Sequence, residues 1–235
     1  VGVSSATSIS LVRQALCMNP DAGFLLMANN ANSKAYNMQM SDIHPNKARG
    51  VNVATVGQSI KADYNAKIKI GANSCAFSIV GYLKVIGNNG VNIVGQREAT
   101  KGNFGIYNYT DNNVKLVAAD SSDPQKLLVS SAVTLNPDIL SHILCVLNRT
   151  NNTISFYLNN ILKYTGSLPS GFGSIDATTA IDILSTSSYL QGKILRFDWL
   201  NFAPTATEVG YLWNSGRPDQ FIIPGLPKLR TYMQY

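Results

Sequence analysis

Charged residues and long apolar runs are both scarce in this sequence of 235 residues. Only 14% of the positions are charged and 45% are hydrophobic, which excludes a disordered chain, because such chains combine high charge with low hydrophobicity. No run of about 18 apolar residues is present, so no membrane-spanning helix is expected. No basic segment followed by an apolar core opens the sequence, and no signal peptide is expected in it. Since the first residue is Val1 rather than Met, a leader removed earlier stays an open alternative.

Cysteine and histidine are rare as well. Cys17, Cys75 and Cys145 are an odd number of thiols without CxxC spacing, which argues against a disulfide framework. With His44 and His142 as the only histidines, a zinc site is not expected. Cys75 and Cys145 lie in apolar runs and are predicted to be small buried core residues. This usage favours folding in a reducing compartment, such as a cytoplasm in which virions assemble. The sequence predicts no cofactor.

The net charge of +6 is spread thinly along the chain. The densest basic stretches, Lys61 to Lys69 and Lys228 to Arg230, are modest, and aromatic residues are not interleaved with them. A groove for single-stranded nucleic acid combines both features. Scattered surface lysines therefore explain the charge, and no nucleic-acid partner is predicted.

Alternation of apolar and polar residues predicts β-strands from about residue 65 onward. Weaker signals precede them at 24–27 and 51–56, while 8–18 fits a short helix or a strand. Asn159 and Asn160 form a pair that tolerates the positive φ of a tight hairpin turn. The predicted strands are 66–70, 75–80, 103–109, 113–117, 142–147, 153–158, 161–165, 179–184 and 192–200. A large number of short strands is typical of a β-sandwich.

One short helix is predicted near the C-terminal end, from Thr205 to Ser215. Thr205 and Glu208 have the spacing of a capping box, in which the N-cap hydroxyl and the third helical carboxylate satisfy each other's backbone N–H groups. An apolar stripe follows and predicts that the helix docks on a sheet with Leu212 and Trp213 buried. The stripe is Val209, Leu212 and Trp213, and the stop signals are Gly216 and Pro218.

Seven short motifs follow one another between residues 75 and 216. They are Cys75–Val80, Val91–Gln96, Phe104–Tyr107, Ser141–Val146, Thr153–Asn160, Gly192–Phe197 and Leu212–Gly216. In this order they resemble the laminin G-like domains of the concanavalin A-like lectin/glucanase superfamily. The resemblance implies an all-β fold: a two-sheet antiparallel jelly-roll β-sandwich with one short C-terminal helix. The phrase Gly216-Arg217-Pro218-Asp219 resembles phage appendage proteins and surface proteins of gut bacteria.

The resemblance also suggests domain bounds. We expect a single domain over residues 1–216, best supported over 65–216, with 1–64 as N-terminal strands or an extension. Residues 217–235 contain two further prolines and read as a linker or arm. The family's acidic pair in the strand 192–197 is replaced by Leu195-Arg196. Any role of those carboxylates in relatives therefore does not carry over.

Catalysis is not expected. The superfamily's glycoside hydrolases carry three carboxylates at E-x-D-x-x-E spacing, which places them on one face of a strand, and this spacing is absent. His142 falls at a structural strand position, which argues against a Ser-His-Asp arrangement. Relatives often hold calcium at the sandwich rim. Loop candidates are Asp111, Asp120 and Asp123, but turn formation explains them better and no metal is predicted.

A ligand surface is predicted on three tyrosines. Strand alternation turns Phe104 and Ile106 inward, so Tyr107 and Tyr109 point outward, and the same logic turns Tyr157 outward in its strand. If these strands share a sheet, three rings line one face. Sheet propensity alone also explains the three tyrosines.

These observations predict a non-catalytic binding module of a larger surface or virion protein, of the phage tail-fibre kind. Its expected partner is a glycan or a cell-surface receptor, together with other chains of an assembly and possible homo-oligomers. A purely structural decoration module acting through protein contacts is the alternative. The expected location is a virion or the extracellular cell surface.

Overall fold

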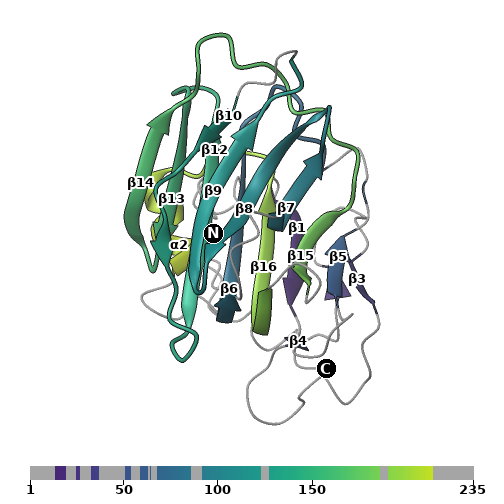
Figure 1. The fold of residues 1–235 in the computed structure, drawn as a ribbon, viewed down its shortest axis with the longest axis vertical. Helices are drawn as coiled ribbons and strands as arrows, with labels where there is room; N and C mark the ends of the chain where they lie inside the picture. Colours follow the sequence, from purple (N-terminus) through teal and green to yellow (C-terminus); the bar gives the residue numbers. More distant parts are fainter. Residues whose placement is uncertain are drawn as a thin grey trace, which may run out of the picture.

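The chain folds into two antiparallel β-sheets that face each other (Figure 1). This computed structural model describes residues 14–19, 25–26, 33–36, 51–53, 59–62, 64, 68–85, 92–122, 127–185 and 190–213. One sheet, called the β6 sheet, runs β14 (Ile161–Ser167), β13 (Thr153–Leu158), β12 (Ser141–Asn148), β6 (Cys75–Val85), β16 (Leu190–Leu200), β1 (Gln14–Asn19) and β2 (Leu25–Leu26), with β4 (Val51–Val53) also on β16. The other, the β8 sheet, runs β10 (Leu127–Val129), β9 (Asn113–Ala119), β8 (Gly102–Thr110), β7 (Asn92–Glu98), β15 (Ile181–Ser185), β5 (Ser59–Ala62) and β3 (Ser33–Tyr36), with β11 (Val133–Thr134) on β9.

The predicted fold class is confirmed, because the described chain is an all-β two-sheet sandwich with one short helix. The strand predicted over 66–70 is wrong for its described part. Ile68 and Ile70 are buried at 0% and 1% exposure, yet residues 68–70 pair with no strand. Their alternation reflects burial of every second side chain in a loop. The N-terminal segment supplies strands to both sheets. The linker or arm expected at 217–235 lies outside the described residues.

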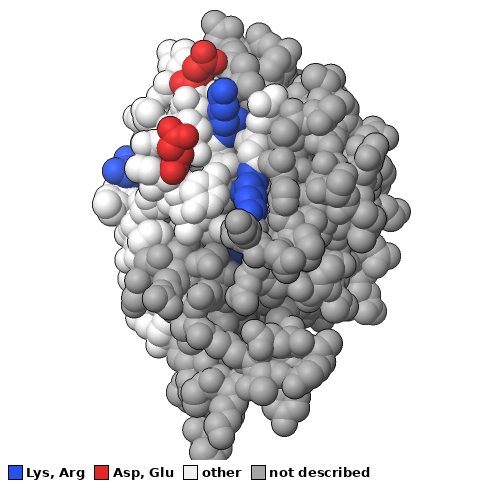
Figure 2. Space-filling model, turned by 90° about the horizontal axis from the view of Figure 1, so that it is seen from below, with Lys and Arg blue, Asp and Glu red and all other residues white. Residues whose placement is uncertain are grey.

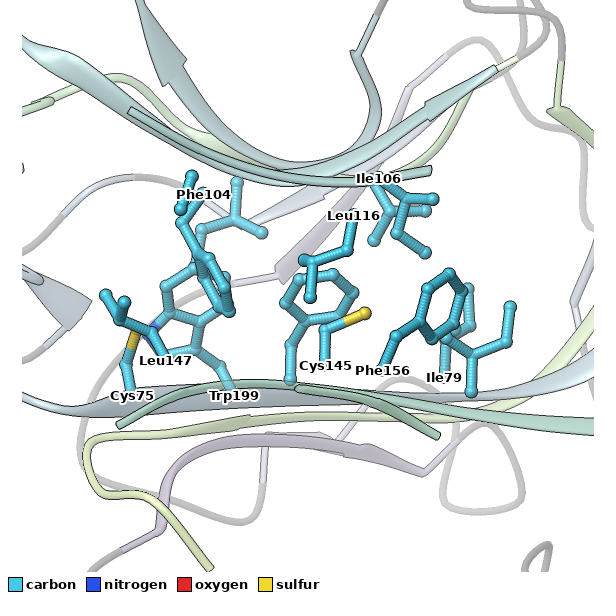
Figure 3. Packing of buried hydrophobic residues seen from close by; sticks show 14 of the residues in the cluster. Cys75, Ile79, Phe104, Ile106, Leu116, Cys145, Leu147, Phe156 and Trp199 are labelled. Carbon is cyan, nitrogen blue, oxygen red and sulfur yellow. The ribbon is translucent and has the colours of Figure 1, made fainter. Parts of the chain in front are cut away.

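An aromatic cluster joins the two sheets. The rings of Phe77 in β6 and Phe104 in β8 meet edge to face with centroids 5.4 Å apart, and Trp199 in β16 stacks on Phe77 at 6.0 Å. Figure 3 shows Phe104 reaching from its sheet toward Trp199 on the other, with aliphatic side chains and the Cys145 thiol filling the rest. Each aromatic contact adds about 0.5–1.5 kcal/mol beyond the burial itself.

Cys75 and Cys145 lie in this core. Cys75 and Cys145 are free thiols with 2% and 0% exposure, which confirms them as buried core residues. Burial raises the pKa of both thiols far above their usual range, so they stay protonated.

The helix α2 (Ala206–Trp213) packs on the outer face of the β6 sheet, beside β12 and β13 (Figure 1). The capping box is confirmed: the Thr205 hydroxyl accepts from the Glu208 backbone N–H at 3.3 Å, and the Thr205 N–H donates to the Glu208 carboxylate at 2.7 Å. Val209 is the buried anchor, together with the backbone-proximal part of Glu208. The prediction that Leu212 and Trp213 are fully buried is wrong. Leu212 packs against the outer cluster and Trp213 stacks on His142 of β12, and both side chains remain partly exposed.

The hairpin turns use asparagine in the left-handed region. Asn159 and Asn160 have φ values of 52° and 64°, which confirms the predicted turn between β13 and β14. Asn112 has a φ of 56° in the turn between β8 and β9. Asparagine tolerates this conformation better than most residues with a Cβ atom.

Charges are interspersed at the lower end of the molecule. Figure 2 shows basic and acidic residues there as separate small spots, without one continuous patch among the residues that are described. In the part of the chain that the structure describes, no helix is long and apolar enough to cross a membrane.

Candidate binding groove

A groove of about 290 Å³ lies on the outer face of the β8 sheet. Its floor follows from the strand register. Gly105 in β8 pairs with Gly95 in β7 on one side and with Val117 in β9 on the other, and Val129 of β10 continues the row. Val117 and Val129 of this row line the groove, and the two glycines lie beside them in the same row.

Gly95 is required where β7 approaches β8 beside the groove. Its φ is +126°, and a Cβ atom added there would lie 2.3 Å from the Phe104 carbonyl oxygen and 2.5 Å from the Gly105 Cα. No L side chain fits at that distance without a shift of the neighbouring backbone. The close approach of β7 to β8 thus leaves the middle of the outer face without side chains.

Larger side chains rise around this floor. Tyr107 and Tyr109 of β8 and Lys115 of β9 stand at one end, Arg97 of β7 at the other, and Leu127 of β10 at the side. Tyr109 is 49% exposed and Leu127 is 58% exposed, so the rim is apolar and open to solvent. Exposed apolar groups beside a hollow mark binding surfaces more often than ordinary surface.

Each of the two tyrosines carries a cation on its ring. The Arg97 guanidinium carbon lies 5.8 Å from the Tyr107 ring centroid, and the Lys115 ammonium lies 3.6 Å from the Tyr109 centroid. Asn103, which is 4% exposed, donates its amide N–H to the Tyr107 hydroxyl at 2.9 Å. Burial raises the pKa of the Tyr107 phenol, against a smaller opposing effect of Arg97, so this hydroxyl stays neutral.

The groove lining contains a single carboxylate, Glu98, and it is already engaged. Its oxygens pair with Lys101 at 2.8 Å and accept from the Thr178 backbone N–H at 2.9 Å. These contacts lower the pKa of Glu98, with the Lys101 hydrogen bond the largest cause. A glycosidase needs one carboxyl group that holds a proton and a second one opposite it. Neither is present in the groove lining.

The third predicted tyrosine lies elsewhere. Tyr157 is on β13 in the β6 sheet, whereas Tyr107 and Tyr109 are on β8 in the other sheet. The expectation that three rings line one face is therefore wrong. The alternation correctly predicted that the three tyrosine side chains point away from the core. Asn108, on the opposite side of β8 from Tyr107, is buried with 1% exposure. Which sheet a strand joins is decided by long-range pairing, which the alternation does not show. Tyr157 packs beside α2 against the cluster that includes Leu144 and Val209.

A sealed polar cluster lies on the same outer face of the β6 sheet, formed by Ser78, His142, Arg196 and Asp198. The His142 Nε2 is 3.0 Å from the Ser78 hydroxyl, and Trp213 of α2 stacks on the imidazole with centroids 5.9 Å apart. Arg196 and Asp198 form an ion pair at 2.6 Å.

The cluster cannot reach a substrate, because each member is at most 3% exposed. Burial, together with the nearby Arg196 charge, lowers the pKa of His142 from 6.5 to about 3. Serine, histidine and aspartate thus occur together here, but as packed groups under a helix. His142 is a structural strand residue, as predicted.

The aspartates considered for calcium have other roles where they are described. Asp120 is buried at 0% exposure and accepts from the backbone N–H groups of Ser122 at 3.1 Å and Gly173 at 2.7 Å. It therefore ties two loops together. Asp111 is exposed in the turn after β8, and residue 123 lies outside the described residues. No group of three or more His, Cys, Asp or Glu suited to a metal occurs among the described residues.

Sequence reasoning identified Tyr107 and Tyr109 but missed Arg97, Asn103 and Lys115. A signal existed for Lys115, which alternates outward in a predicted strand. Arg97 follows a strand whose partner could not be assigned from the sequence, so its position over Tyr107 was not predictable.

The fold is that of known binding domains, as comparison with solved structures shows. The binding domain of Paraclostridial Mosquitocidal Protein 1 has a TM-score of 0.63 at 16% identity, over 88% of this chain and 53% of that one. The binding domain of Botulinum Neurotoxin DC in complex with SialylT has a TM-score of 0.68 at 13% identity, over 90% and 52%. The same binding domain in complex with rat synaptotagmin II has a TM-score of 0.64 at 12% identity, over 90% and 53%.

This chain therefore spans about half the length of the solved structures it matches. At these identities the likeness establishes the fold. No family model and no curated protein matches the sequence.

Proposed function

We propose that this chain is a non-catalytic binding module that recognises glycans through the groove on the β8 sheet. One observation carries the proposal: the groove on the outer face of the β8 sheet is lined by small apolar side chains and bordered by the exposed side chains of Leu127 and Tyr109. A pyranose ring offers an apolar C–H face and a hydroxyl edge, which suits a hollow that joins aromatic and amide groups.

The two tyrosines have different parts in this proposal. Tyr109 is half exposed and offers ring surface that Lys115 does not cover, so it is the stacking platform. Tyr107 is partly buried, and its hydroxyl is held by Asn103, so it forms the wall of the groove. Tyr157, on the other sheet, is outside the groove.

The comparisons support binding over catalysis as the role of the fold. Binding domains with this architecture are found in complex with SialylT and with rat synaptotagmin II. The proposal extends to a laminin G-like domain over residues 1–216, carried by a larger surface or virion protein outside the cell, with 217–235 as an arm.

The test is a glycan array probed with the wild-type protein and the Tyr107→Ala, Tyr109→Ala double variant. A reproducible saccharide hit is expected, and the double variant should bind it at least about fivefold more weakly, as loss of aromatic anchors does. Tyr211→Ala is the matched control, since Tyr211 is a 40% exposed tyrosine on α2.

Because Tyr107 is partly buried, the single variant Tyr109→Ala is measured alongside, with thermal unfolding of each protein. Unchanged binding by a folded double variant would remove this groove from consideration. An array without hits, together with tight self-association, would favour the structural decoration module.

A further inference from the structure

The groove contains two cations that no carboxylate neutralises. The ion pairs formed within the described part of the chain are Lys69–Asp176, Lys101–Glu98 and Arg196–Asp198. Arg97 and Lys115 contact tyrosine rings instead. Arg97 is the cross-strand partner of Asn103 and Lys115 is that of Tyr107, so the two cations enter the groove from different points along β8. Both side chains belong to the groove lining.

The acidic groups nearest to the groove do not offset these charges. Glu98 is engaged by Lys101 and Thr178, and Asp182, which pairs with Gly95 across the strands, is absent from the groove lining. The Tyr107 hydroxyl is neutral. The groove therefore presents two positive charges above an uncharged floor.

We propose that the groove selects an acidic saccharide, a sugar carrying a carboxylate or a sulfate ester, whose anion is held by Arg97 and Lys115. This inference rests on the proposed glycan-binding function. The sugar ring lies over Val117 and Val129 against Tyr109, and the anion faces the two cations of the groove lining.

The stacking geometry suits this role. The contact with the Tyr107 ring takes up none of the Arg97 N–H donors in a conventional hydrogen bond, so they can form a bidentate contact with a planar anion. The Lys115 ammonium, held over Tyr109, keeps donors that point away from the ring. Both cations are thus positioned before the ligand arrives, which lowers the entropic cost of binding.

A neutral sugar is the weaker match. Any ligand that fills the groove displaces water from Arg97 and Lys115, and desolvation of an unpaired charge is costly. An anion replaces the lost hydration with charge-assisted hydrogen bonds. The same physics predicts that selectivity falls as salt rises.

The test uses matched pairs of saccharides in isothermal titration calorimetry with the whole chain. One pair is a sialylated lactose and plain lactose, and the other is a sulfated uronate disaccharide and its desulfated form. The two pairs distinguish a carboxylate from a sulfate ester as the recognised anion. At about physiological salt, one acidic member should bind about tenfold or more tightly than its partner.

Charge variants assign the preference to the groove. Arg97→Gln and Lys115→Gln should each weaken binding of the acidic member about tenfold without weakening the neutral member, so the difference between the two members shrinks. Arg97→Lys, which keeps the charge, should retain most of the preference. Lys163→Gln on β14 is the control, because Lys163 is an exposed cation on the other sheet.

The outcomes separate this inference from the function on which it rests. Equal binding of acidic and neutral members, lost in Tyr109→Ala, overturns the anion preference and keeps the glycan groove. A preference that persists in Arg97→Gln and Lys115→Gln, or that Lys163→Gln also removes, overturns it as well. Binding of no saccharide by the folded protein, or of a protein receptor alone, overturns both.

Discussion

At the scale of single residues, His142 is a polar group kept neutral inside the fold. Its pKa is lowered from 6.5 to about 3 by burial and by Arg196. Below pH 6.5 the His142 imidazole is protonated in the unfolded chain but stays neutral in the folded chain. The free energy of unfolding therefore falls as the pH drops from 6.5 toward 3. Urea unfolding should show a loss of about 1 kcal/mol between about pH 7.5 and about pH 5.5 from this residue.

His142→Gln isolates the effect, because glutamine can still bond Ser78 but does not titrate. The variant should lose the pH-dependent part and be flatter than wild type across the same interval. Equal slopes for the two proteins would mean that His142 is protonated in the folded state.

Substitution of glycine by alanine is expected to have opposite effects on stability at two positions. At Gly95 an added Cβ atom would meet the Phe104 carbonyl oxygen at 2.3 Å with φ at +126°, whereas Gly210 in α2 has nothing within 4 Å. Gly95→Ala should therefore lower the free energy of unfolding by about 1–3 kcal/mol. Gly210→Ala should raise it by up to about 1 kcal/mol, since alanine favours the helix. Chemical denaturation of both variants checks the signs, and a neutral Gly95→Ala would contradict the register of β7 on β8.

At the scale of elements, the N-cap of α2 can be tested by a pair of threonines. Thr205 caps the helix through its hydroxyl, while Thr207, one residue into the helix and exposed, has no such contact. Thr205→Ala should lower the free energy of unfolding by about 1 kcal/mol, and Thr207→Ala should change it very little. Urea unfolding checks this through the midpoint concentrations, provided that the dependence of the free energy on urea is the same for all three proteins. Equal effects of the two substitutions would show that the cap does not hold the helix.

The sequence predicted elements better than their arrangement. The hairpin of β13 and β14 was predictable because the Asn159-Asn160 turn and the alternation on both sides are local signals. The separation of Tyr157 from Tyr107 was not predictable, since it depends on β12 joining β6 rather than β8. At residues 68–70 a local signal was misleading. The alternation predicted a strand there, but alternating burial also occurs in loops that cover a core. Arg97 was missed because it lies over the Tyr107 ring only through the pairing of β7 with β8, in which it is the partner of Asn103.

At the scale of the whole molecule, the N-terminal segment determines whether the sandwich is complete. β1 and β4 both pair with β16, an inner strand of the β6 sheet, and β5 pairs with β15 in the β8 sheet. Every described strand and the helix lie before residue 214. Removal of the N-terminal segment is therefore expected to prevent folding, whereas removal of the residues after 216 is expected to leave stability almost unchanged.

A chain trimmed to residues 65–235 should fail to fold, because β16 and β15 would each present unpaired backbone groups along a new sheet edge. Such edges promote aggregation. A chain trimmed to residues 1–216 keeps all described pairings and should unfold within about 2 °C of the full chain, less than a loss of 1 kcal/mol would shift it. Size-exclusion chromatography and thermal unfolding measure both. A soluble 65–235 chain with the full chain's melting temperature would show that residues 1–64 are an extension and that the sandwich is self-sufficient without them.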